Sequence, residues 1–165
     1  SMGKLTLTDA VLGVTLTGIS FFVAAVLLTI LSHWDLNRLL INILSVLIMG
    51  LAILGVSLSQ SFEALYSCFI IFGFAVGLYV SNQVCYVASY FIPSDYMIIR
   101  LSYVFVVMGI GALLGPVVAG PFSENFGMKY LYFFIGGLSL TGFFILFSYW
   151  LGKKVSEYRQ LIDNR

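Results

Sequence analysis

Long runs of apolar residues alternate with short polar segments along the whole chain. About 20 apolar residues cross the roughly 30 Å hydrocarbon core of a bilayer, and only helices or closed barrels satisfy their backbone there. Five runs have that length, and with the fourth counted from Leu101 none of them contains an acidic or basic residue. The pattern predicts membrane-spanning helices over residues 10–31, 39–58, 64–92, 97–120 (or 101–120) and 130–151.

The polar segments between these runs are short, so consecutive helices are expected to lie antiparallel. The predicted fold class is therefore all-α, a polytopic membrane helix bundle with five transmembrane helices. Residues 1–152 would form the bundle and residues 153–165 a short cytoplasmic tail. The expected connections are residues 32–38, 59–63, 93–100 and 121–129.

Basic residues gather on one side of the predicted bundle. Because Lys and Arg are retained on the cytoplasmic side, their distribution predicts a cytoplasmic C-terminus and, after five spans, an N-terminus outside. A plasma-membrane location is expected. The cytoplasmic set is Arg38, Arg100, Lys153, Lys154, Arg159 and Arg165, against Lys4 and Lys129 on the other side.

Composition supports a membrane protein and excludes several classes of function. The chain is 61% hydrophobic and 9% charged, whereas a soluble domain is about one quarter charged. A net charge of +1 without a basic run gives no sign of a nucleic-acid partner. Cys68 and Cys85 lie about 25 Å apart on one predicted helix, too far to bond. With His33 as the single histidine, we expect no metal, no cofactor and no enzyme activity.

Glycines spaced four residues apart mark two candidate contacts between helices. Gly73 and Gly77 share one face of the third helix, and Gly111 and Gly115 one face of the fourth. Small residues at this spacing let neighbouring backbones approach, either as static packing or as a sliding contact. Pro116 cannot donate an amide to its turn, so a bend or gating hinge is expected there, softened by Gly115 and Gly120.

Uncharged polar side chains in the third helix are the main candidates for a binding site. An amide facing hydrocarbon is unfavourable, so Asn82 and Gln83 must turn inward, to another helix or to a wet cavity. Both readings remain open. Tyr79, Asn82 and Tyr86 recur at helical spacing and form one stripe, and Ser20 of the first helix is a further candidate whose hydroxyl can instead bond its own backbone.

The run GIGALLGPVVAGPFSENFGMKY, from Gly109 to Tyr130, resembles the eleventh helix and following loop of the monocarboxylate-transporter family of the major facilitator superfamily. Gly115, Pro116 and Gly120 match that family's pattern, while Val117 replaces its second proline and Glu124 stands for its acid. FGFAVG and LNRLL, residues 72–77 and 36–40, are similar to its tenth helix and the start of its ninth.

The resemblance implies helices eight to twelve of a twelve-helix transporter for small organic solutes, working by rocking of two halves. Implied partners are the bilayer, the N-terminal half and the solute; an accessory membrane protein is a further candidate. Because Ser1 precedes Met2, we expect missing upstream residues or a tag remnant. The family's Asp and Arg in helix eight correspond to Ser20 and Ala24, so proton or sodium symport and anion binding lose their usual residues, and a neutral or aromatic substrate is an alternative.

Two other functions compete with transport. The absent charge pair favours a non-transporting membrane assembly subunit or truncated transporter homologue, whereas the preserved Gly-Pro hinge disfavours it. A channel of several copies is third, although no ring of acidic residues or selectivity loop supports it.

A central cavity between two halves requires helices from both. The polypeptide alone, reconstituted in liposomes, is therefore expected to give no solute uptake above empty vesicles. Uptake above that background would contradict the two-half architecture.

Overall fold

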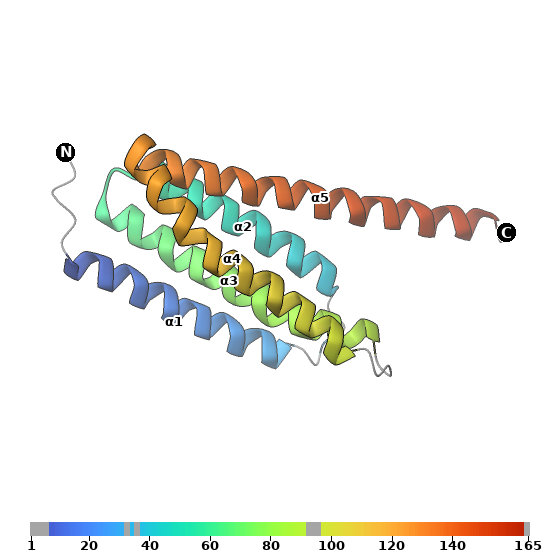
Figure 1. The fold of residues 1–165 in the computed structure, drawn as a ribbon. Helices are drawn as coiled ribbons and strands as arrows, with labels where there is room; N and C mark the ends of the chain where they lie inside the picture. Colours follow the sequence, from blue (N-terminus) through green and yellow to red (C-terminus); the bar gives the residue numbers. More distant parts are fainter. Residues whose placement is uncertain (1–6, 32–33, 35–36, 92–96, 164–165) are drawn as a thin grey trace.

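The computed structural model describes residues 7–31, 34, 37–91 and 97–163, and these form five helices. Figure 1 shows the helices running side by side, with α1 beginning at one end of the bundle and α5 ending at the other. All five are long and apolar enough to cross a membrane. Their bounds are α1 Leu7–Leu31, α2 Arg38–Leu58, α3 Phe62–Phe91, α4 Met97–Phe126 and α5 Met128–Asp163.

Four of the helices pack in the order α1, α3, α2, α5, which differs from their order in the chain. The inner helix α2 has the most buried surface, and its buried positions recur every three or four residues, from Leu39 and Ile43 to Val46 and Gly50. This spacing puts them on one broad helix face. The bundle core therefore lies around α2 and the face of α3 that covers it.

Helix starts follow local capping chemistry. The side chain of Asn37 accepts a hydrogen bond from the Leu40 amide at 3.2 Å, and the Ser61 hydroxyl accepts one from the Ala64 amide at 3.3 Å. Both side chains satisfy a donor that a helix end leaves unpaired. The second and third helices therefore begin close to the predicted positions.

The predicted nine-residue connection at 121–129 is wrong, because α4 continues through Pro121 to Phe126. Ser123 and Asn125 donate to the carbonyls of Gly120 and Pro121, both at 2.8 Å, which stabilises the turn around the proline. Only Gly127 separates α4 from α5, with a φ of 88° that glycine adopts without strain. Phe122 stacks on Phe134 across this junction, with ring centroids 5.4 Å apart.

The last helix also extends beyond its predicted end at residue 151. It has 36 residues, which corresponds to about 54 Å, whereas a bilayer core is about 30 Å thick. The segment expected as a tail therefore continues α5 as a helix through Asp163. Figure 1 shows this end of α5 projecting past the other helices.

Two glycines allow α1 and α3 to meet closely. A Cβ built on Gly77 would lie 2.9 Å from the Ala24 Cβ, and one built on Gly73 would lie 2.9 Å from the Thr17 Cα. Those separations are shorter than real Cβ contacts, so neither site has room for a side chain. The GFAVG segment of α3 is therefore held against the backbone of α1.

The α2–α5 contact uses the same principle with leucines as the opposing groups. A Cβ on Gly136 would lie 2.8 Å from Leu54, and one on Gly50 would lie 3.0 Å from Leu140. The Ser139 hydroxyl adds a hydrogen bond to the Val46 carbonyl at 3.3 Å. Each helix thus receives a leucine from its neighbour at a glycine.

The fourth helix is packed differently, because its side chains from Ser102 to Val118 are exposed except for that of Val104. A Cβ added to Gly111, Gly115 or Gly120 would meet no atom of the described chain within 4 Å. The expected packing at the first two glycines is therefore absent from the described contacts. Pro116 lies inside the continuous helix.

We expect Gly77→Ala to lower the free energy of unfolding by about 1–3 kcal/mol, the usual cost of overpacking. The matched control Gly115→Ala should be neutral or stabilising by up to about 1 kcal/mol, since alanine favours helix and meets no neighbour. Thermal unfolding in lipid nanodiscs measures both. Equal effects of the two substitutions would contradict close packing at Gly77.

Candidate functional site

Asn82 is a residue of α3 at its contact with α2, and it has no exposed surface. Its Nδ2 donates to the Arg38 carbonyl oxygen at 2.6 Å and to the Asn42 Oδ1 at 2.8 Å. The Asn42 side chain is itself 2% exposed. Because an amide without partners is costly in an apolar interior, this geometry supports the interhelical reading of Asn82 over the cavity reading.

The other candidates occupy two different places. Ser20 is buried on α1, donates to the Thr17 carbonyl at 3.0 Å and lies at the α1–α3 contact beside Gly73. Tyr79, Gln83 and Tyr86 are half-buried on α3. For these four residues and Asn82, five candidates in all, a role with a solute stays a prediction.

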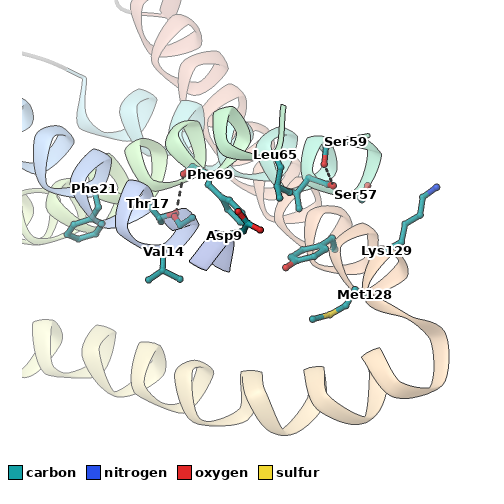
Figure 2. Close-up of a pocket in the computed structure, with 14 residues that line it drawn as sticks. Asp9, Val14, Thr17, Phe21, Ser57, Ser59, Leu65, Phe69, Met128 and Lys129 are labelled. Carbon is teal, nitrogen blue, oxygen red and sulfur yellow. Dashed lines mark hydrogen bonds between the residues drawn. The ribbon is translucent and has the colours of Figure 1, made fainter. Parts of the chain in front are cut away.

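A cavity of about 990 Å³ lies elsewhere in the molecule, and none of those five residues lines it. Figure 2 shows side chains of α1, the end of α2, α3 and the start of α5 around it, with α4 passing alongside without contributing a lining residue. The wall is mostly apolar. The lining residues are Asp9, Gly13, Val14, Thr17, Gly18, Phe21, Val56, Ser57, Ser59, Leu65, Phe69, Met128, Lys129 and Tyr132.

A few polar groups interrupt this apolar wall. The Tyr66 hydroxyl donates to Asp9 Oδ1 at 3.1 Å, joining the first turns of α3 and α1. Thr17 Oγ1 donates to the Gly13 carbonyl at 2.9 Å and lies 3.4 Å from the Phe69 carbonyl. Asp9 and Lys129 place opposite charges on the lining.

Sequence reasoning missed the residues of this cavity. The helix-spacing rule could have placed Gly13 and Thr17 on neighbouring positions of one α1 face, but it does not indicate which helix meets that face. Asp9 lay just outside the predicted first helix, which in the structure begins earlier, at Leu7.

The side chains around the cavity are suited to binding. Within the described ranges, no group of three His, Cys, Asp or Glu side chains could hold a metal ion. The described helices offer an apolar wall with hydroxyl groups and the charges of Asp9 and Lys129, which could bind a solute through hydrogen bonds and charge.

Comparison with protein families gives a match between this chain and the Major Facilitator Superfamily over residues 2–164. The chain belongs to the major facilitator superfamily. Comparison with curated proteins finds no match. As a major facilitator protein with five candidate membrane spans, it is a multi-pass membrane protein of a transporter family.

In this major facilitator chain, the two positions assigned by resemblance to the family's charge pair lie in the α1–α3 contact. Ala24 is fully buried, and Ser20 is 8% exposed. Both face glycines of α3 at close range. Because a Cβ on Gly77 would lie 2.9 Å from the Ala24 Cβ, an arginine at residue 24 would have no room beside Gly77.

Tyr66→Phe is expected to reduce the free energy of unfolding by about 0.5–1.5 kcal/mol, because it removes one hydrogen bond. Asp9→Asn retains an acceptor oxygen for Tyr66 and should have a smaller effect. Thermal unfolding of both variants in nanodiscs measures the difference. A larger loss with Asp9→Asn would show that another contact of Asp9 dominates.

Proposed function

We propose that the chain is part of a secondary active transporter for small organic solutes, of the monocarboxylate-transporter type or a divergent type with neutral or aromatic substrates. The observation that carries this proposal is the family match along residues 2–164. The order of the resembling segments, from LNRLL to the Gly-Pro run of α4, supports the finer assignment. The alternative of a non-transporting assembly subunit is not favoured by the match.

Alternating access is the proposed mechanism, with the described helices moving as part of one half. The exposed face of α4 supports this, because its glycines and apolar side chains offer a long surface for further helices. Glycine faces permit close contacts that can form and separate with little rearrangement. We propose Gly111, Gly115, Pro116 and Gly120 as part of this moving contact.

The substrate class follows from the side chains available. Ser20 and Ala24 supply no charge in α1, and both are committed to packing against α3. Tyr79, Gln83 and Tyr86 remain half-buried on α3 and carry hydroxyl and amide groups. These groups would hydrogen-bond an uncharged or aromatic solute, and a monocarboxylate would need a cation from elsewhere in the transporter.

We further propose a plasma-membrane location with the C-terminal end of α5 in the cytoplasm. Arg38 begins α2, and Lys153, Lys154 and Arg159 lie near the end of α5, so these basic residues share one end of the antiparallel bundle. Lys129 begins its helix at the opposite end. Retention of basic residues on the cytoplasmic side supports this orientation.

Uptake by cells that express the complete reading frame encoding this chain tests the proposal. Labelled lactate and labelled phenylalanine represent the two substrate classes. Gln83→Leu and Tyr79→Phe should each weaken the apparent affinity for the transported solute by roughly three- to tenfold, the equivalent of one hydrogen bond. Surface abundance is measured in parallel.

The matched control is Tyr158→Phe, because Tyr158 is 67% exposed on the projecting part of α5. It should leave uptake unchanged. Normal affinity in both α3 variants at normal abundance would contradict the assignment of these residues to the solute path. Uptake of neither solute above untransfected cells would contradict the proposed substrate classes.

A further inference from the structure

Both described hydrogen bonds of Asn82 are donated from α3 to residues of α2. Both described bonds are donated by Nδ2 to the first turns of α2, at 2.6 Å to Arg38 and 2.8 Å to Asn42. Its Oδ1 is buried and has no hydrogen-bond partner among the described residues. The amide group therefore has one defined orientation, in which its donors face α2.

The contact with α1 lies on a different face of α3. Gly77 meets Phe21 and Ala24 of α1. Asn82 follows five residues later, which corresponds to a rotation of about 140° around the helix axis. Steric contact on one side and a hydrogen-bonded amide on the other together define how α3 is rotated about its axis.

Apolar packing by itself specifies that rotation weakly in a membrane, because apolar side chains are as well solvated by lipid as by each other. A hydrogen bond is directional and is satisfied over a narrow range of rotation. A single buried Asn is known to set the register of paired helices in this way. Asn82 is the group in the described α2–α3 contact that combines full burial with two such bonds.

We propose that Asn82 is a positioning residue: by donating to α2, it sets the rotation of α3 and so directs Tyr79 and Gln83 toward the solute path. The existence of that path rests on the proposed function, whereas the rotation of α3 is argued from the α2–α3 hydrogen bonds alone. Asn82 would act on the solute through its neighbours and would not contact it.

Gln83 provides a specific alternative state. It is the next residue and carries the same donor group, about 100° around the helix. If Asn82 could no longer donate, a rotation of one residue would bring the Gln83 amide toward Arg38 and Asn42, at the cost of separating Gly73 and Gly77 from α1. That rotation would displace each Cα of α3 by roughly 3.5 Å, from a helix radius of about 2.3 Å.

The test measures the rotation directly in the full chain in lipid nanodiscs. Spin labels are attached to Tyr79→Cys on α3 and Leu44→Cys on α2, after replacement of Cys68 and Cys85 by alanine. Leu44 is 47% exposed and so tolerates a label. Asn82→Leu removes the donors without introducing a carboxyl that could be protonated and donate, and it should change the distance between labels, with α3 Cα displacements of up to roughly 3.5 Å.

Variants of the acceptor keep the test decisive if Asn82→Leu fails to fold. Asn42→Leu removes the acceptor and should also shift the distance, whereas Asn42→Asp retains an acceptor oxygen and should preserve it. Ser45→Ala is the matched control, because Ser45 is equally buried on α2 but bonds only the Ile41 carbonyl of its own helix, at 2.7 Å, among the described contacts.

An unchanged distance in folded Asn82→Leu, or equal distances in Asn42→Leu and Asn42→Asp, would overturn the proposal and leave Asn82 with a role in stability only. The measurement uses no solute. A shifted distance together with normal uptake by the Tyr79 and Gln83 variants would refute the proposed solute path and leave the positioning role intact.

Discussion

Helices in a bilayer gain little from bringing apolar side chains together, because lipid tails solvate those side chains equally well. Their association depends on close backbone approach and on a few hydrogen bonds that lipid cannot replace. The described contacts of this protein follow that constraint. Gly73 and Gly77 of α3 face α1. Between α2 and α5, Gly50 and Gly136 each face a leucine of the other helix. The α2–α3 contact adds the buried amide of Asn82.

The same constraint explains why α4 is different. Its Gly111 and Gly115 have the spacing of the glycines in α3, yet no described atom lies near them. Glycines four residues apart leave room for a neighbouring backbone, but their spacing does not determine which helix packs there. The helix is linked to α5 through Gly127 and the stacked rings of Phe122 and Phe134, so it is attached at this junction while most of its length stays exposed.

Packing and candidate function use adjoining residues of the same helices. Ser20 and Ala24 could be lined up with the charged pair of related transporters, but in this fold they form the surface against which α3 glycines pack. On α3, Asn82 contacts α2 while its neighbour Gln83 is half-buried. The 100° turn between adjacent residues separates the amide that joins two helices from the one that we propose for the solute path.

The sequence by itself determined the number of helices and the approximate starts of α2 and α3, because apolar length and backbone satisfaction in lipid depend on local composition. The superfamily was indicated separately, by the resemblance of the run from Gly109 to Tyr130. The sequence did not determine that α4 continues through Pro121 to Phe126, because a proline can either end a helix or lie within it. Nor could spacing distinguish Gly73 from Gly111, or decide between the two readings of Asn82. Those outcomes depend on which helix packs against each face. Only the tertiary structure, in which α3 lies between α1 and α2, decided that.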